Sequence, residues 1–454
     1  EESVETPKLL ADRLYINDGK GTFSKGQLSE MFTSTSCVLA GDMDGDGDLD
    51  LFVGGRNVPG KYPDLPRSYL LLNEHGTFID VTEQLCSELK NPGMVTSGLW
   101  TDYNNDGKLD LILVGEWMTP RIFQNTGGTF REVTAGSGLD SAYGWWNSIN
   151  AGDFDNDGDI DYVVGNLGLN SRYKATQKYP IEMYCNDVDE NGSVEILLTY
   201  YNNGLQYPLR GISLMYAQIP TLNKKVPSAT QYAKLEFREI FPKEKIDSAV
   251  YNKATTFANS YLENKGNGRF SIHLLPVMAQ VAPVFGSSVQ DYDGDGNLDL
   301  LMVDNFYGPD REMWRYDSGE GLFLHGDGKG EFEVLPSAKS GLFNPYDARS
   351  VITFPSADSN LYILIGNNTS PLKVYKKDVS NKKQSILRVN GKDGYTYAIL
   401  TLKNGKTRRH EFYYGAGYLS QSSLDILLSP EVKSVAFYKG STIQKTVTVS
   451  QQMR

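Results

Sequence analysis

The sequence predicts an all-β protein, a six- or seven-bladed β-propeller followed by a small β-sandwich-like domain. Two recurring units predict the propeller. The first is an apolar segment with an Asn- or Gly-rich turn and an aromatic residue, as in YLLLNEHGTF (69–78). The second is an acidic loop that runs directly into an apolar strand, as in GDMDGDGDLDLFVGG (41–55). Together they repeat every roughly 50 to 60 residues, which is the length of one four-stranded blade.

The first unit predicts β-hairpins. Its turn residues, mainly Asn and Gly, tolerate the positive φ angles that tight hairpin turns require. We find it at 14–23, 69–78, 121–130, 261–270 and 322–332. No amphipathic helical period accompanies the repeat, so a helical solenoid is excluded.

Net charge, cysteine spacing and the lack of a long apolar run limit the kinds of partner that the sequence predicts. The 454 residues carry a formal net charge of -12, whereas nucleic-acid binding needs clustered Lys and Arg, so no nucleic-acid partner is expected. The three cysteines lack metal-ligand spacing, and we expect them to be buried apolar residues. The chain has no apolar run of about eighteen residues, and we therefore expect no transmembrane segment in it.

The domain organisation follows from where the repeat stops. We assign residues 1–379 to the propeller, with 346–375 as a blade without an acidic loop and 181–201 as one with a degenerate loop. Proline-rich segment 202–253 interrupts the rhythm and is read as an insertion, with a helix at 228–241 that Ser228 caps. Residues 380–454 show short alternating strands with NG and DG turns, which predict a separate β domain.

The acidic loops have the pattern D-x-[DN]-x-D-G-x-[LI]-D, which predicts calcium sites. Oxygen ligands at alternate positions suit a hard cation that takes six to eight oxygens, whereas Mg²⁺ retains water and rarely accepts an all-protein cage. An EF-hand requires a Glu at the twelfth position, where these loops have Val53, Leu113, Val164 and Met302. The glycine at the sixth position permits the sharp turn.

We expect four bound calcium ions, with one weaker fifth candidate. Each site takes side chains from positions one, three, five and nine and the backbone carbonyl of position seven. The predicted ligands are Asp42, Asp44, Asp46, Asp48 and Asp50; Asp102, Asn104, Asp106, Lys108 and Asp110; Asp153, Asp155, Asp157, Asp159 and Asp161; and Asp291, Asp293, Asp295, Asn297 and Asp299. The fifth candidate is Asp187, Asp189, Asn191, Ser193 and Glu195.

These loops resemble the FG-GAP/VCBS repeats of integrin α-chain propellers and of many secreted bacterial proteins, over roughly residues 1–375. The segment FYYGAGYLSQSS (412–423) looks like the signature of the ASPIC/UnbV module, although LDILLSP (424–430) departs from the usual continuation. The joint arrangement is similar to VCBS-repeat proteins of Gram-negative bacteria. That resemblance implies an exported protein, at the outer-membrane surface or extracellular.

The expected function is non-catalytic binding of a protein or glycan at the cell surface. The loops on the face opposite the acidic ones carry aromatic and Arg residues, which are typical of binding hot spots. The candidate ligand-binding residues are Arg56, Tyr62, Trp117, Arg121, Asn170, Arg172, Tyr307 and Arg311. No catalytic residues are assigned, because no GxSxG, HExxH or Cys/His pairing occurs. Two alternatives stay open, a structural subunit of an outer-membrane assembly and a glycan-active lyase or hydrolase.

Overall fold

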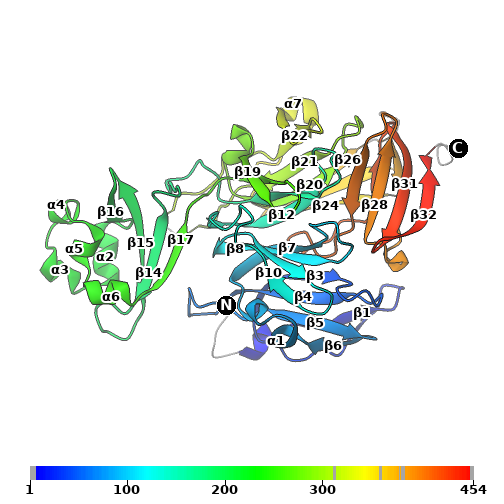
Figure 1. The fold of residues 1–454 in the computed structure, drawn as a ribbon. Coiled ribbons are helices and arrows are strands. Elements are labelled where there is room, and N and C mark those ends of the chain that lie inside the picture. The colour runs from blue at the N-terminus through cyan, green and yellow to red at the C-terminus, as the bar shows by residue number, and fades with distance from the viewer. Residues whose placement is uncertain (1–6, 310–312, 357–359, 378, 380–383, 450–454) are drawn as a thin grey trace.

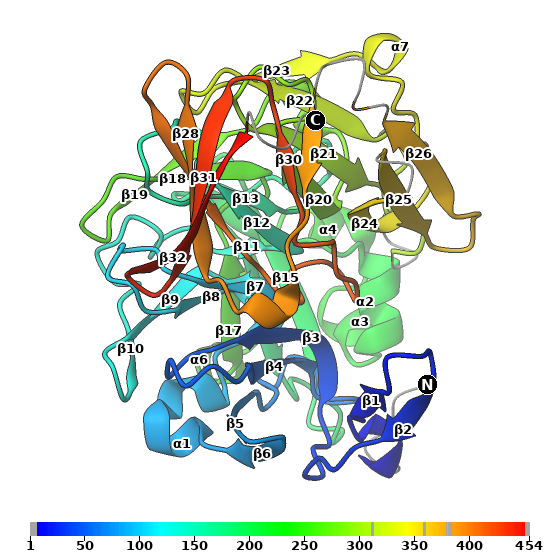
Figure 2. The same cartoon turned by 90° about the vertical axis from the view of Figure 1, so that its right-hand side faces the viewer.

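The computed structural model describes residues 7–309, 313–356, 360–377, 379 and 384–449. Its strands form many separate antiparallel sheets, and five of these stand around a common centre as propeller blades (Figure 2). The innermost strands, β3, β7, β12, β20 and β24, contact one another in that order. The all-β, propeller-like fold that the repeats predict is therefore confirmed.

The first three blades contain the repeats with acidic loops between their first and second strands. Blade 1 comprises β3 (Ser34–Gly41), β4 (Asp50–Asn57), β5 (Tyr69–Glu74) and β6 (Thr77–Asp80). Blade 2 comprises β7 (Met94–Thr101), β8 (Asp110–Met118), β9 (Arg121–Asn125) and β10 (Phe130–Glu132), and the short β11 (Gly144–Trp145) pairs with β8. Blade 3 comprises β12 (Ser148–Gly152), β13 (Asp161–Gly165), β18 (Ser260–Asn264) and β19 (Phe270–Leu274).

The remaining propeller elements include one blade with an acidic loop and one without. Blade 4 comprises β20 (Val284–Gln290), β21 (Asp299–Asp304), β22 (Leu322–Gly326) and β23 (Phe332–Leu335). Blade 5 has three strands, β24 (Ala348–Pro355), β25 (Leu361–Asn367) and β26 (Lys373–Lys377). The short helices α1 (Thr82–Leu85) and α7 (Ser337–Ser340) follow β6 and β23.

The blade count differs from the prediction of six or seven. The described residues form five blade sheets, and the hairpin of β1 (Tyr15–Asn17) and β2 (Phe23–Lys25) lies in the sector between blade 5 and blade 1 (Figure 2). One predicted unit, 181–201, is not a blade. Its two strands pair instead with strands of the insertion.

The insertion is longer than 202–253. The chain leaves blade 3 after β13 and returns at β18, so residues 166–259 form an inserted lobe. Its sheet has the order β16 (Leu205–Pro208), β15 (Glu195–Asn202), β14 (Ile181–Asn186) and β17 (Val250–Ala254). Its helices are α2 (Ile212–Gln218), α3 (Leu222–Lys225), α4 (Ala229–Tyr232), α5 (Phe237–Ile240) and α6 (Lys243–Asp247).

The single helix predicted at 228–241 is in fact the two helices α4 and α5. The Ser228 hydroxyl accepts the backbone N–H of Gln231 at 3.2 Å, so the predicted cap is confirmed. A second start signal, the capping box of Glu236 and Glu239, begins α5 after the four residues 233–236 that separate it from α4. The helices pack on the sheet through a core of their own, which includes Tyr184, Leu197 and Phe237.

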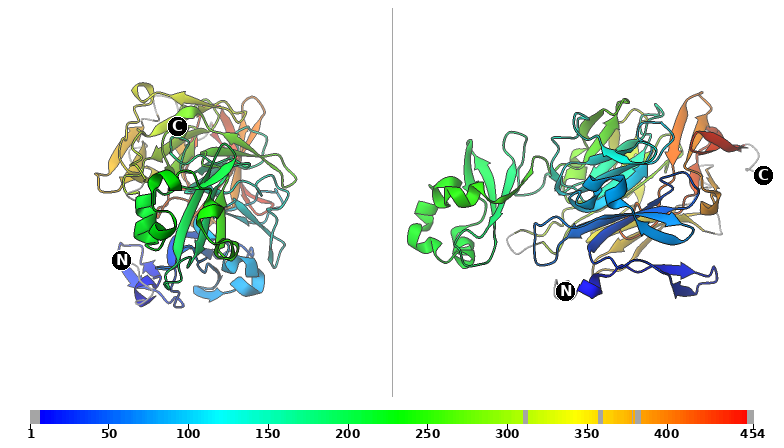
Figure 3. Two further views of the ribbon diagram at one scale, coloured as in Figure 1. Left: turned by 90° about the vertical axis from the view of Figure 1, so that its left-hand side faces the viewer. Right: turned by 60° about the horizontal axis from the view of Figure 1, so that its bottom comes forward.

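The C-terminal domain consists of two sheets. β27 (Ser385–Leu387) pairs with β30 (Ile426–Leu428), and the larger sheet has the order β29 (Thr407–Glu411), β28 (Tyr397–Leu402), β31 (Val432–Lys439) and β32 (Thr442–Thr448). The predicted boundary at 380 lies outside the described residues. The domain sits on one side of the propeller and the inserted lobe on the other (Figures 1 and 3).

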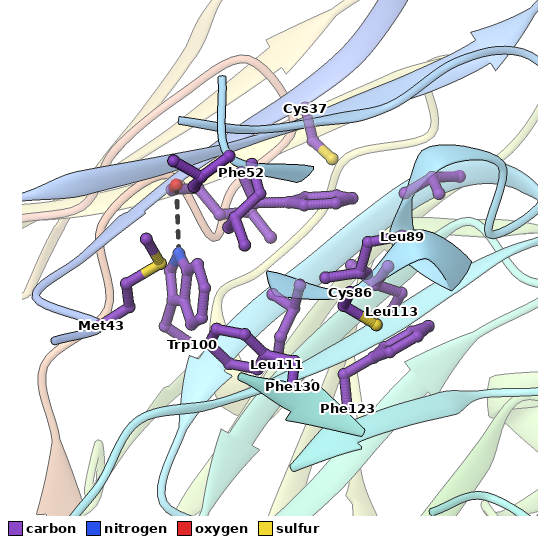
Figure 4. Close-up of a cluster of buried hydrophobic side chains, with 14 of the residues drawn as sticks. Cys37, Met43, Phe52, Cys86, Leu89, Trp100, Leu111, Leu113, Phe123 and Phe130 are labelled. Carbon is purple, nitrogen blue, oxygen red and sulfur yellow. Dashed lines mark hydrogen bonds between the residues drawn. The ribbon is translucent and has the colours of Figure 1, made fainter. Parts of the chain in front are cut away.

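Apolar side chains between neighbouring blades hold the propeller together. Between blades 1 and 2, Phe52 packs against Trp100 and Leu111, all at most 4 % exposed. The Trp100 indole N–H donates to the Leu39 carbonyl at 3.2 Å (Figure 4). The three cysteines are free and buried, as predicted. In the described part of the chain, no helix combines the length and apolarity needed to cross a membrane.

The centre of the propeller is filled by the segment that follows β29. Residues 416–418 lie among all five innermost strands and leave a space of only about 10 Å³ there. The Ala40 N–H donates to the Tyr414 carbonyl at 3.2 Å, and the Ser423 N–H donates to the Thr353 carbonyl at 2.9 Å. We call residues 412–424 the channel segment.

Candidate functional site

The acidic loops share one hydrogen-bond pattern, which shapes them for a cation. In the first loop the Gly47 N–H donates to Asp42 at 3.1 Å and the Met43 N–H donates to Asp50 at 2.9 Å. The corresponding bonds recur in the fourth loop, from Gly296 to Asp291 and from Tyr292 to Asp299. The loop glycines need positive φ, for example +101° at Gly47. The backbone therefore turns the carboxylates of each loop toward one another.

Three of the four propeller loops bring three carboxylates close enough to share an ion. The groups, each with ligand atoms within 4.8 Å of one another, are Asp42, Asp44 and Asp50; Asp153, Asp155 and Asp157; and Asp291, Asp293 and Asp295. His325 joins Asp293 and Asp299 in a further group at the fourth loop. Sequence reasoning did not identify His325 as part of a site, because it lies on β22, away from the loop in sequence.

The fifth candidate also gathers, but on the inserted lobe. Asp187, Asp189 and Glu195 form a group between β14 and β15, and the Val188 N–H donates to Glu195 at 2.9 Å as Met43 does to Asp50. The loop is therefore a copy of the propeller loops, although its strands do not form a blade.

The second loop differs because a side chain of the C-terminal domain enters it. Arg409 lies 2.8 Å from Asp102 and also contacts Glu411 at 3.2 Å. Asp110, at the ninth position, is fully buried, and its Oδ2 has no hydrogen-bond partner among the described residues. An orphaned buried carboxylate oxygen is costly unless a cation or a proton is present. The oxygen donors of this loop therefore fit a metal ion.

The raised pKa values of the metal-free loops also favour a bound cation. Burial, opposed by hydrogen bonds and reinforced by neighbouring aspartates, raises the pKa of Asp110 and Asp161 to about 8. The same causes raise the pKa of Asp153 and Asp299 to about 7. These carboxylates resist ionisation near neutral pH when no cation faces them.

Asparagines on the third strands hold the loops in place, a role that sequence reasoning missed. The Asn125 amide donates to Met43 O of blade 1 at 2.7 Å and to Leu109 O of its own blade at 3.2 Å. Asn264 makes the equivalent bridge from blade 3 to Tyr103 O of blade 2 at 2.8 Å. Their position just before each hairpin turn is the available signal, but it also fits a simple turn residue.

The opposite face carries a cavity of about 370 Å³ between the propeller and the inserted lobe. Arg56, Tyr62, Trp117 and Arg172, four of the eight predicted ligand-binding residues, line it. The structure does not bring the other described ones there. Arg121 pairs with Glu132, the Asn170 amide donates to the Val281 carbonyl, and the Tyr307 hydroxyl donates to the Pro345 carbonyl. Arg311 lies outside the described residues.

A polar chain crosses the aromatic wall of the cavity. The Trp117 indole N–H donates to the Tyr62 hydroxyl at 2.6 Å, and that hydroxyl donates to Glu116 at 2.8 Å. Arg56 forms an ion pair with the same carboxylate. Trp117 has a φ of +59°, which is unusual for a bulky residue and is found where the surroundings enforce it.

Further lining residues could not be predicted, because they come from distant segments. Trp145 packs edge-on against Trp117 with ring centroids 5.0 Å apart, and the inserted lobe closes the space with Met183, Ile196 and Leu198. Trp145 is not among the ligand-binding residues that the sequence predicts. It lines the cavity and also packs against Phe257 of the lobe.

One prediction concerns the stability of the metal-free protein. The pKa values of Asp110, Asp153 and Asp161 are higher in the folded than in the unfolded chain, so their contribution is fully present below about pH 4 and is lost as pH rises through 7 to 8. We therefore expect the unfolding midpoint of the metal-free protein to fall between pH 5 and pH 8. Thermal unfolding across this range checks it, and a rising midpoint would contradict it.

A second prediction tests the asparagine bridge. Asn125→Ala leaves buried carbonyls of two blades without their donor and should cost at least about 1–3 kcal/mol. Asn73→Ala is the matched control, since its amide donates at 3.1 Å only to Leu49 O of its own blade at an exposed position. Denaturant unfolding measures both, and equal losses would argue against a bridging role.

Comparison with known proteins addresses the repeats. The model of the FG-GAP-like repeat matches residues 10–53 and 102–164, which contain the first three acidic loops. No curated protein matches the chain. Among solved structures, the chain is similar to one described as an exotype rhamnogalacturonan lyase YesX, with 12 % identity over 90 % of this chain and 80 % of that one. The TM-score of 0.26 is too low to support any inference from that likeness. The propeller of this protein is thus built in part from FG-GAP-like repeats.

Proposed function

We propose that the protein is a calcium-stabilised, non-catalytic binding module of the cell surface, and that its ligand is a saccharide held in the cavity between the propeller and the inserted lobe. The cavity carries this proposal. Its volume of about 370 Å³ falls in the range of small-ligand sites, which are mostly apolar and aromatic with a few fixed polar groups. Trp117 and Trp145 supply aromatic surface, while Glu116, Tyr62 and Arg56 supply fixed hydrogen-bonding groups.

The cavity supports binding rather than glycan hydrolysis. Most glycoside hydrolases use a pair of carboxyl groups that flank the scissile bond. Of the described residues that line the cavity, Glu116 alone is acidic, and its carboxylate already accepts from Tyr62 and Arg56. A carboxylate held in this way is suited to fix the orientation of a sugar hydroxyl.

Calcium is the cation that we assign to the acidic loops. The donor set is all oxygen, and it exceeds what the octahedral shell of Mg²⁺ takes from protein. At a calcium concentration about 100 times the dissociation constant, each site would stabilise the fold by roughly 2.7 kcal/mol. The matched repeats and the resemblance to exported VCBS-repeat proteins support an exported location, where free calcium is abundant.

The calcium assignment predicts a defined loss in one variant. Asp155→Ala removes a third-position ligand of the loop at 153–161, so one ion should be lost or weakened while the others remain. Asp140→Ala, at an exposed position outside the loops, is the control and should bind as wild type. Calcium titration with elemental analysis decides. An unchanged stoichiometry and affinity in Asp155→Ala would refute the assignment for this loop.

The cavity assignment predicts a loss of ligand affinity. Tyr62→Phe removes the hydroxyl that links Trp117 to Glu116, and hydrogen bonds to charged groups are worth about 1.5–3 kcal/mol, which corresponds to roughly 10- to 150-fold in affinity. Tyr15→Phe, at an exposed tyrosine of β1, is the control. A labelled saccharide library identifies a ligand by fluorescence. If saccharides bind equally well to both variants, the site lies elsewhere; if none binds wild type, the saccharide proposal fails.

A further inference from the structure

The C-terminal domain contacts all four acidic loops of the propeller. Lys439 lies beside Gly47 of the first loop, and Ser441 lies beside Gly107 of the second. The backbone N–H of Arg409 donates to Asp153 of the third loop at 2.8 Å. In the fourth loop, Arg408 donates to Gly296 O at 2.6 Å and Gln384 donates to Asp291 O at 2.7 Å. The domain therefore touches each of the four loops, although much of the first loop stays exposed.

Two buried arginines make this contact electrostatic. Arg408 is 2 % exposed and Arg409 is 6 % exposed, and buried guanidinium groups need fixed partners. The loop at 153–161 carries five aspartates, so one divalent cation would leave three negative charges there. Arg408 faces the fourth loop, whose four aspartates also stay negative after a divalent cation binds. The second loop, where Arg409 pairs with Asp102, carries three aspartates and Lys108, so a divalent cation would neutralise it.

The same segment connects the acidic loops to the propeller centre. Glu411 follows the two arginines on β29 and accepts the Thr101 hydroxyl at 2.8 Å and the Asp102 N–H at 3.2 Å. The channel segment begins at the next residue and pairs with the innermost strands at Ala40 and Thr353. When the C-terminal domain docks, it therefore contacts the acidic loops and places the channel segment in the propeller centre in one event.

We infer that docking of the C-terminal domain and cation binding by the acidic loops are thermodynamically coupled, so that each strengthens the other. Docking fixes the loop backbone at Gly296 and Asp291, and a bound cation fixes the same backbone. Whichever of the two events, docking or cation binding, occurs first lowers the conformational-entropy cost of the other. Coupling of this kind is reciprocal, so a change that prevents docking must weaken cation binding by the same factor. The inference rests on the proposal that the loops bind calcium.

Gly415→Ala should prevent docking of the C-terminal domain without changing the sequence of any acidic loop. Gly415 lies in the channel segment with a φ of +81°, and an added Cβ would lie 2.0 Å from the Val38 carbonyl oxygen of β3. Backbone cannot give way to such an overlap, so the segment cannot seat. No acidic loop is altered. We expect calcium affinity to fall by at least about fivefold, the lower end of usual coupling.

Gly405→Ala is the matched control. Gly405 lies in the turn between β28 and β29 of the same domain, its φ is +88°, and an added Cβ meets nothing within 4 Å. Both substitutions thus place a Cβ on a left-handed backbone, and only Gly415→Ala blocks docking. The control should keep the calcium affinity of wild type.

Hydrogen exchange of the full-length protein supplies the independent readout. In Gly415→Ala with calcium, and in wild type after chelation, residues 412–424 should exchange faster while β31 and the blade strands stay protected. Fast exchange of 412–424 with unchanged calcium affinity would overturn the coupling, as would a channel segment that stays protected after chelation. Absence of calcium binding in wild type would overturn the calcium assignment as well. None of these readouts involves the cavity ligand, so they are independent of the saccharide proposal.

Discussion

The rest of this structure depends on buried carboxylates at the start of the second strand of four blades. Asp50, Asp110, Asp161 and Asp299 are each at most 1 % exposed, and each receives a backbone N–H from the third strand of its blade. Each carboxylate therefore ties the second strand of its blade to the third, which a solvated turn residue could not do. Their desolvation has to be offset, and backbone donors alone do not offset it, as the raised pKa values show. Bound cations and the arginines of the C-terminal domain would both supply positive charge to these loops, as Lys108 does beside Asp106 in the second loop.

The need for positive charge beside these buried carboxylates distinguishes the acidic face of the propeller from the opposite face. On the acidic face, the loops and the two arginines form a charged layer between the blades and the C-terminal domain, and the uncharged channel segment continues from it into the propeller centre. On the other face, the loops carry aromatic residues that contact the inserted lobe. The two faces are therefore chemically different, and the C-terminal domain and the inserted lobe lie on opposite sides of the propeller (Figure 1). An antiparallel blade allows this, because its alternate connections emerge at opposite ends.

The inserted lobe contains a loop of the propeller type on strands that do not belong to a blade. Its β14–β15 loop reproduces the hydrogen bonds of the propeller loops, with Glu195 in the place of the ninth aspartate. Yet the strands pair with β16 and β17, and their apolar faces pack on the helices of the lobe and on Trp145 and Trp117. The local loop conformation is set by local hydrogen bonds, whereas membership of a blade depends on which apolar surfaces lie next to the strands.

The sequence by itself determined the features that local spacing controls. The hairpins, the acidic loops and their cation-ligand pattern, and the cap at Ser228 all depend on residues close together in the chain, and repetition made the blade pattern visible. Only the tertiary structure decided which distant segments meet. Residues that no local pattern links meet in four places: the pairing of Arg409 with Asp102, the position of the channel segment at the propeller centre, the extent of the insertion, and the cavity that Tyr62, Trp117 and Met183 line. Such contacts follow from the summed packing of whole sheets, because a side chain's partners across a domain boundary are fixed only when both surfaces exist.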